Sequence, residues 1–275
     1  MKYKLLCTDM DGTLLDDRKE ISTVNREAIK LANDNGVKVV VCTGRLFVSS
    51  KFYSDLLELK TPVIASNGAY IREKDRDEVI YKCAINKKEC MEILNLFRKY
   101  NIYAHFYTED TIFADKIIYV SQKYLEYNKT IPKDVQVKVK VVEDWEKVFE
   151  EYDGKIFKAF ATDENTEKIR KAKEEFKKLS KFNVVSSYDS NFEIMSKEVS
   201  KGRAVEILAG FYGINKDEII CIGDNENDLS MIEYAGLGVA MKNGSNLVKD
   251  NSNYITDTNN NNGVAKVIDK FIFNK

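Results

Sequence analysis

The chain is poor in proline and histidine, with 2 prolines and 1 histidine among 275 residues. Because proline is so scarce, no proline-rich linker marks a domain boundary. The histidine, His105, lies in the alternating stretch YAHFY, which favours a structural place on a strand over a catalytic role. Acid–base chemistry in this chain must therefore fall mainly to carboxylates.

Charge excess, long apolar runs and paired cysteines are also missing. The 43 basic and 44 acidic side chains leave a formal net charge of −1, which argues against nucleic acid or an anionic membrane as a partner. No apolar run approaches the roughly 18 residues of a membrane span. We find no secretion signal and expect a cytoplasmic protein. The 5 cysteines form no CxxC pair, which argues against disulfides and a zinc site.

The composition that is present suits a folded enzyme. A hydrophobic fraction of 44%, with 11% aromatic residues, is enough to bury a core. Intrinsic disorder and a fibrous repeat are excluded, and the length predicts one large domain or two smaller ones.

Both ends of the chain alternate apolar runs with helical patterns, which predicts βαβ units around a parallel sheet. In the first eighty residues, strands are expected at 4–8, 37–42 and 62–65. Ser22 or Thr23 is expected to cap a helix that ends at Gly36; its predicted buried face is Val24, Ala28, Leu31 and Ala32. The pattern returns with a helix that starts at Ser200 and ends at Gly213; its apolar residues are Ala204, Ile207, Leu208 and Phe211. Further strands are expected at 218–222, 237–241 and 254–256.

The middle of the chain has another character, with aromatic alternating runs among charged helical stretches such as 87–99 and 164–180. We predict an α/β fold, a Rossmann-like parallel core with an inserted α+β cap. The core is expected to be discontinuous, at 1–81 and 197–275, with the cap domain at 82–196. The asparagine run at 259–262 is expected to be a surface turn.

Polar residues follow three of the core apolar runs. Asp9 and Asp11 follow the first, Thr43 the second, and Asp224 the strand at 218–222. Because ligands of open α/β sheets bind outside the carboxyl ends of the strands, we expect one site there. Taken alone, each acidic group has a simpler interpretation: an Asp-Gly turn for the first, and helix capping by Asp228 or Asn225 for the second, which could coexist with a site.

Bringing these carboxylates together requires cations, since each like-charged pair at about 4 Å costs on the order of 4 kcal/mol at an effective dielectric near 20. Oxygen ligands without histidine or cysteine favour Mg²⁺, and Lys201 is a candidate second cation, although it could be a solvated lysine. Such a site suits attack by one carboxylate on a phosphate monoester, while a second carboxylate handles protons.

The ordered motifs DMDGTLL (9–15), TGR (43–45), SKG (200–202) and GDNENDLSM (223–231) resemble the haloacid dehalogenase superfamily. The large insert and the C-terminal stretch are similar to its Cof-type branch, subclass IIB with a type C2 cap. The resemblance implies that Asp9 is the nucleophile and Asp11 the general acid–base. It implies a Mg²⁺ site at Asp9, Asp11 (through its backbone carbonyl) and Asp224, supported by Asn227 and Asp228. The phosphate-binding residues would be Thr43, Gly44 and Lys201, and the substrate-contacting residues Arg45, Asn67, Gly68 and Glu193.

The implied function is a Mg²⁺-dependent phosphatase that acts through an aspartyl-phosphate. Its expected partner is a small phosphate monoester, with sugar phosphates first and flavin mononucleotide or pyridoxal phosphate next. A phosphomutase and a non-catalytic regulator that binds a phosphorylated ligand are the alternatives. The sequence leaves the oligomeric state open.

Overall fold

The computed structural model describes residues 1–275 and divides them into two compact units. The first unit comprises Met1–Gly44, Ser50–Tyr81 and Ser200–Lys275. The second comprises Lys82–Val199 together with the short segment Arg45–Ser49, which packs there through Leu46 and through a hydrogen bond from the Val48 N–H to the Glu109 carbonyl. The long insert thus folds as a body of its own.

A five-stranded parallel sheet forms the centre of the first unit, in the order β14-β13-β12-β1-β2. Its strands are β1 (Leu5–Thr8), β2 (Lys38–Val41), β12 (Ile219–Gly223), β13 (Leu237–Ala240) and β14 (Tyr254–Ile255). Strand β1 lies between β2 and β12, and the residues of these three strands are almost all buried, as expected for parallel strands covered on both faces. The predicted parallel sheet is confirmed.

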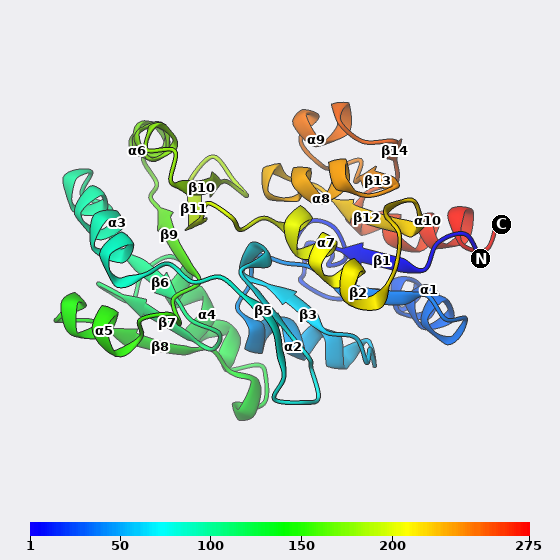
Figure 1. The fold of residues 1–275 in the computed structure, drawn as a ribbon, viewed down its shortest axis with the longest axis horizontal. Coiled ribbons are helices and arrows are strands. Elements are labelled where there is room, and N and C mark those ends of the chain that lie inside the picture. The colour runs from blue at the N-terminus through cyan, green and yellow to red at the C-terminus, as the bar shows by residue number, and fades with distance from the viewer. The chain divides into compact units, whose positions relative to one another are not determined.

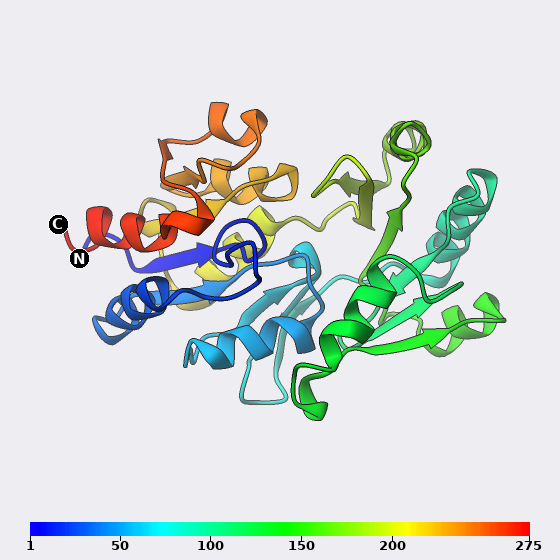
Figure 2. The ribbon, with the colours of Figure 1, turned by 180° about the vertical axis from the view of Figure 1, so that it is seen from behind.

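Helices cover both faces of this sheet, with α7 and α8 on one face (Figure 1) and α1 and α10 on the other (Figure 2). The helices are α1 (Thr23–Asp34), α2 (Phe47–Leu56), α7 (Lys201–Tyr212), α8 (Leu229–Tyr234), α9 (Asn246–Asp250) and α10 (Gly263–Phe271). A small sheet of β3 (Val63–Ala65), β4 (Tyr70–Arg72) and β5 (Val79–Lys82) follows α2. No helix is both long and apolar enough to cross a membrane.

Helix α1 begins where expected, because the Ser22 hydroxyl accepts a hydrogen bond from the Asn25 N–H. The predicted buried face was wrong in part, since Val24 and Leu31 are 50% and 40% exposed. The face that packs inward instead carries Asn25, Ile29 and Ala32. The Asn25 amide donates to the Leu14 carbonyl and accepts from the Ala265 N–H, so a polar side chain is satisfied inside and turns the helix.

Helix α7 is capped by Ser200 and ends at Gly213 in the left-handed conformation, as predicted. Among its apolar residues, Phe211 is 53% exposed. The buried residues lie mostly in the first turns: Lys201, Gly202, Ala204, Val205, Leu208 and Ala209. The start of α7 lies directly against α8, and Gly202 permits this close packing. Any larger residue there would clash, because its Cβ would lie 2.2 Å from the Ser230 carbonyl oxygen.

The second unit is a six-stranded sheet in the order β10-β11-β9-β6-β7-β8, antiparallel except for the pair β7 and β8. The strands are β6 (His105–Tyr107), β7 (Thr111–Ala114), β8 (Lys138–Val141), β9 (Lys158–Thr162), β10 (Phe182–Val185) and β11 (Asn191–Ser196). The helices are α3 (Lys87–Lys99), α4 (Val120–Asn128), α5 (Trp145–Glu151) and α6 (Thr166–Lys178). The predicted α+β insert and the place of His105 on a strand are confirmed.

An aromatic core joins α3, α5 and α6 to one face of this second sheet. Phe97 from α3 contacts Phe106, Phe176 and Phe192 with ring centroids 5.7–6.3 Å apart. Such tilted and edge-on contacts are the geometry that aromatic quadrupoles favour. The second unit therefore has its own hydrophobic core.

All cysteines of the chain are free thiols, and four of the five are buried. Cys7 and Cys221 are paired directly across β1 and β12. Both burial and the contact with Cys221 favour the protonated thiol of Cys7. The side-chain hydrogen bond between the Cys7 and Cys221 thiols is the largest influence that raises the pKa of Cys7, and burial adds to it. Buried thiols of this kind pack as small apolar groups.

Candidate functional site

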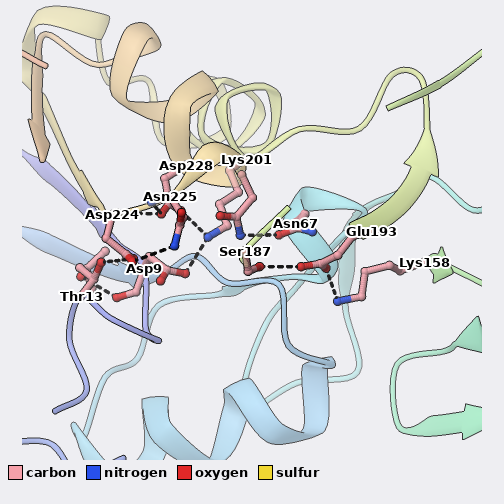
Figure 3. Close-up of polar contacts among 12 residues, drawn as sticks. Asp9, Thr13, Asn67, Lys158, Ser187, Glu193, Lys201, Asp224, Asn225 and Asp228 are labelled. Carbon is pink, nitrogen blue, oxygen red and sulfur yellow. Dashed lines mark hydrogen bonds and ion pairs between the residues drawn. The ribbon is translucent and has the colours of Figure 1, made fainter. Parts of the chain in front are cut away.

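Strands β1 and β12 run side by side, so the residues that follow them meet at one edge of the sheet. The Asp9 N–H donates to the Ile222 carbonyl at 2.9 Å, and Asp224 comes directly after Gly223. One carboxylate oxygen from each of Asp9, Asp224 and Asp228 lies within 4.8 Å of the other two. Figure 3 shows these three side chains converging from separate parts of the chain. The predicted convergence of Asp9 and Asp224 is what the strand pairing produces.

Lys201 lies among these carboxylates and is fully buried. Its Nζ donates to Asp9 Oδ1 at 2.6 Å and to Asp228 Oδ1 at 2.5 Å (Figure 3). Burial opposes the ammonium charge, but the carboxylates of Asp228 and Asp9 outweigh burial and raise the pKa of Lys201 well above its usual range. The interpretation of Lys201 as a solvated lysine was therefore wrong, because its position on the first turn of α7 points it into the site.

Asp228 uses both carboxylate oxygens within the protein. Oδ2 accepts from the backbone N–H groups of Asp224 and Asn225 at 2.9 and 3.0 Å, and Oδ1 accepts from Lys201. A Cβ at Gly223 would lie 2.4 Å from the Asp228 Cβ, so the turn is closely packed. Asn225 and Asp228 form a capping box at the start of this turn, so the predicted capping coexists with the site, and Asp228 also orients the charged groups beside it.

The carboxylates of Asp9 and Asp224 are almost fully buried. Together with Asp228 they outnumber the single positive charge of Lys201. Burial is the largest influence on Asp9 and raises its pKa well above the ordinary value, although Lys201 offsets part of the effect. For Asp224, burial followed by the neighbouring Asp228 raises the pKa to about 7, while a hydrogen bond from the Thr13 hydroxyl lowers it. Three carboxylates facing one ammonium suit a further cation, and their all-oxygen donor set fits a hard divalent ion.

Thr43 and Asn67 lie at the next strand ends of the same unit. The Thr43 N–H donates to the Ile64 carbonyl, and the Thr43 carbonyl accepts from the Asn67 N–H at 3.0 Å. Asn67 has a φ of 56° in the short turn Ser66–Gly68, and its amide oxygen accepts from Asn227 Nδ2 at 3.2 Å. The turn thus ties the end of β3 to the Asp224 loop.

Gly68 permits that turn, since its φ is 97° and a Cβ there would lie 2.4 Å from the Ser200 carbonyl oxygen. Gly44 ends the first segment of the same unit. The structure therefore brings Thr43, Asn67 and Asn227 to one sheet edge, and Gly68 against the start of α7.

Asp11 lies outside the group of three buried carboxylates. Its side chain is 32% exposed, and Oδ1 accepts from Lys19 Nζ at 2.9 Å. Four carboxylates were expected together, but the structure unites Asp9, Asp224 and Asp228 and gives Asp11 a cation of its own.

Two of the candidate residues belong to the second unit, namely Arg45 and Glu193. Glu193 is buried on β11, where Oε2 accepts from Lys158 Nζ at 2.6 Å and Oε1 from the Ser187 hydroxyl at 2.8 Å. Figure 3 includes this ion pair. The pair links β9 to β11 and forms a second buried charged cluster.

Sequence reasoning missed the contacts that five residues make with candidate site residues, one of them being Ser187, which donates to Glu193. Thr13 and Asn225 donate to Asp224, Lys19 contacts Asp11, and Lys158 contacts Glu193. Thr13 and Asn225 lie inside the recognised motifs, so their places beside an aspartate were a usable signal. Lys19 and Lys158 lie in no motif, and only the folded chain brings them to their partners.

Comparison with known proteins fits this geometry. The family model for haloacid dehalogenase-like hydrolases matches residues 6–268. A Bacillus subtilis protein named 5-amino-6-(5-phospho-D-ribitylamino)uracil phosphatase YwtE is 34% identical over 284 residues, which cover 98% of each chain.

Solved structures share the whole fold. A haloacid dehalogenase-like hydrolase from B. subtilis superimposes with a TM-score of 0.86 at 28% identity, covering 98% of this chain and 99% of that one. A sugar phosphatase of subclass IIB has a TM-score of 0.80 over 98% of each chain, and at 23% identity that likeness concerns the fold alone. The chain therefore belongs to the haloacid dehalogenase-like hydrolases, as its motifs predicted, and it is a phosphatase.

Proposed function

We propose that this phosphatase hydrolyses small phosphate monoesters through an aspartyl-phosphate on Asp9, with Mg²⁺ as its metal ion. The observation that carries the proposal is the contact of the buried Asp9 carboxylate with the fully buried Lys201 ammonium, beside two further carboxylates. A phosphate monoester is itself negatively charged, so an anionic nucleophile can approach it only where cations neutralise that charge.

The two aspartates of the first motif divide the chemistry. An Asp9 oxygen attacks phosphorus as the bond from phosphorus to the substrate's alcohol oxygen breaks, and Asp11 gives that oxygen a proton. Asp11 then takes a proton from a water molecule, whose oxygen attacks phosphorus and releases Asp9. Lys201, Thr43 and Gly44 would hold the phosphoryl oxygens during both steps.

The donor set fits Mg²⁺, which prefers carboxylate and carbonyl oxygens. Asp9, Asp224 and the backbone carbonyl of Asp11 would hold the ion, and when bound it would neutralise part of the phosphate charge. Asp228 supports the site rather than ligating, because Lys201 and two backbone N–H groups already occupy its oxygens. Asn227 supports it through its hydrogen bond to Asn67.

We further propose that residues 82–196 act as a specificity cap for the core at 1–81 and 197–275. Glu193, oriented by Lys158 and Ser187, would contact the organic part of the substrate. Arg45, Asn67 and Gly68 are the other proposed contacts.

Sugar phosphates are our first substrate class, and phosphorylated ribityl compounds fit beside them. The relative named as a 5-amino-6-(5-phospho-D-ribitylamino)uracil phosphatase, at 34% identity, supports a phosphorylated polyol chain. Flavin mononucleotide carries such a chain too, and pyridoxal phosphate offers an aromatic alternative.

The test is phosphate release from a panel of these compounds, with Mg²⁺ and with a chelator, by the wild-type protein and by Asp9→Asn. We expect release from a narrow subset that requires both Mg²⁺ and Asp9. Transfer of phosphate to another position of the substrate, without release of free phosphate, would favour a phosphomutase. Binding of the panel compounds by a folded protein that neither releases nor transfers phosphate would favour a regulator.

A further inference from the structure

The segment that follows Asp11 is held in place by asparagines from the far end of the chain. Asn243 donates to the Gly12 carbonyl at 2.7 Å, and the Asn243 amide oxygen accepts from the Asn259 N–H at 3.0 Å. Asn259 in turn donates to the Leu15 carbonyl at 3.0 Å and to Asp17 Oδ1 at 3.1 Å. The contacts to Gly12, Leu15 and Asp17 join residues more than 230 positions apart.

Asn260 completes the attachment through a reciprocal pair with Asp17. Its amide nitrogen donates to Asp17 Oδ2 at 2.8 Å, and its amide oxygen accepts from the Asp17 N–H at 3.1 Å. The run at 259–262 lies at the surface, as expected, with Asn260 and Asn261 exposed, but Asn259 is only 5% exposed. Asn259 and Asn260 hold the segment 12–17 together with Asn243, and we call Asn243, Asn259 and Asn260 the asparagine clamp.

Beyond the clamped segment, a tight turn presents Lys19 to Asp11. The Asp16 carboxylate accepts from the backbone N–H groups of Arg18 and Glu20, both at 2.9 Å, which closes the turn. Lys19 has a φ of 65°, a left-handed conformation that lysine seldom adopts. In that conformation its Nζ reaches Asp11 Oδ1 at 2.9 Å.

These features share one consequence for the reaction. The clamp holds the two ends of the segment 12–15 through the carbonyls of Gly12 and Leu15. It also holds the side chain of Asp17, which lies next in the chain to the turn that carries Lys19. A half-exposed ion pair contributes little to stability. The contact of Lys19 with Asp11 therefore points to an effect on Asp11 rather than to a contribution to stability.

We propose that Lys19 and the asparagine clamp are positioning residues that hold the Asp11 carboxyl group where, in its protonated form, it gives its proton to the oxygen of the leaving alcohol. The inference rests on the proposed function, because it takes Asp11 as the general acid. Neither Lys19 nor the clamp touches the reacting atoms in this role; they act through Asp11.

The test compares kcat/KM for two substrates that depend differently on a general acid. A sugar phosphate releases a poor leaving group that needs a proton, whereas p-nitrophenyl phosphate releases an anion that needs none. Lys19→Met should lower the ratio of kcat/KM for the sugar phosphate to that for p-nitrophenyl phosphate by roughly tenfold or more, since general acids contribute about 10²–10⁴-fold. Lys19→Arg should restore most of the ratio. Asn260→Ala, at an exposed position, should lower it in the same direction.

Asn251→Ala is the matched control, because Asn251 is also exposed and donates only to the Leu247 carbonyl of its own helix. It should leave both rates unchanged. An equal loss on both substrates, or no loss on either, in Lys19→Met and Asn260→Ala would overturn the positioning role. Failure of the wild-type protein to hydrolyse either substrate would instead overturn the proposed function.

Discussion

Replacing Asp224 by asparagine should stabilise the metal-free protein while it abolishes phosphatase activity. Burial and the nearby Asp228 raise the pKa of Asp224 from 3.8 to about 7. The carboxylate charge is therefore costly to the folded state when no cation is bound. Asparagine removes that charge and keeps an acceptor for the hydroxyl of Thr13, which donates to Asp224 Oδ1 at 3.0 Å.

The magnitude follows from the pKa. Because the folded protein binds the proton more tightly than the unfolded chain, the penalty is absent below pH 3.8, grows as the pH rises, and is complete above pH about 7. At about 1.4 kcal/mol for each pKa unit, the full penalty is about 4 kcal/mol. The gain in unfolding free energy for Asp224→Asn should thus approach a few kcal/mol at pH 8 and vanish near pH 4.

Urea unfolding of the wild-type and variant proteins in chelator, at pH 8 and at pH 4, measures this difference. Added Mg²⁺ should stabilise the wild-type protein and narrow the gap, because the variant lacks a proposed ligand. Asp250→Asn, at an exposed helix end, is the control and should change stability little at either pH. A variant that is no more stable than the wild type at pH 8 in chelator would refute the electrostatic account.

Three further predictions concern Lys201, Gly12 and His105. Lys201→Met should cost about 3–5 kcal/mol of unfolding free energy because it leaves buried carboxylates unpaired, whereas Lys4→Met at an exposed ion pair should cost less than about 1 kcal/mol; equal losses in denaturant titrations would contradict this. Gly12→Ala should lose activity, since its Cβ would lie 2.5 Å from Asp224 Oδ2, whereas Gly36→Ala, with a similar φ and open space, should keep normal kcat/KM. Burial lowers the pKa of His105 from 6.5 to about 4, so stability from the neutral ring is lost as the pH falls through that range. Between pH 7 and pH 4.5 the free energy of unfolding of His105→Leu should therefore fall by about 2–3 kcal/mol less than that of the wild type. Identical acid unfolding curves for the two proteins would disprove this prediction.

The sequence predicted those parts of the fold that depend on local pattern. Short apolar runs between helical patterns located β1, β2 and β12. Because β1 and β12 pair in parallel, Asp9 and Asp224, which follow these strands, lie close together. Ser22 and Ser200 cap helices as expected, because capping needs only residues that are neighbours in the chain.

What the sequence could not predict depends on contacts between distant residues. Val24 and Leu31 were expected to be buried, but the inward face of α1 carries Asn25 instead. The Asn25 side chain is hydrogen-bonded there to the Leu14 carbonyl and the Ala265 N–H. Lys201 became a buried ion only because α7 starts beside the end of β1. No periodicity in the sequence indicates such polar contacts, since they arise from the packing of whole elements.

The candidate site was predictable to a similar degree. Motif residues such as Asp228 lie where the chemistry requires them, whereas the cation at Asp11 and the clamp from Asn259 follow from the fold alone. Lys19 and Asp11 are 8 positions apart, and Asn259 and Leu15 are 244 apart. No pattern in the sequence near either residue of such a pair indicates the contact.

The central claim is that Asp9 becomes phosphorylated during turnover, and mass spectrometry of the Asp11→Asn variant tests it most directly. Without its general base this variant should hydrolyse the aspartyl-phosphate slowly, so a phosphoryl group should accumulate on Asp9 after mixing with substrate and Mg²⁺. It should be absent from the double variant Asp9→Asn, Asp11→Asn. Phosphate release by the wild type, with no phosphoryl group trapped on Asp9 and with turnover surviving in Asp9→Asn, would contradict the account.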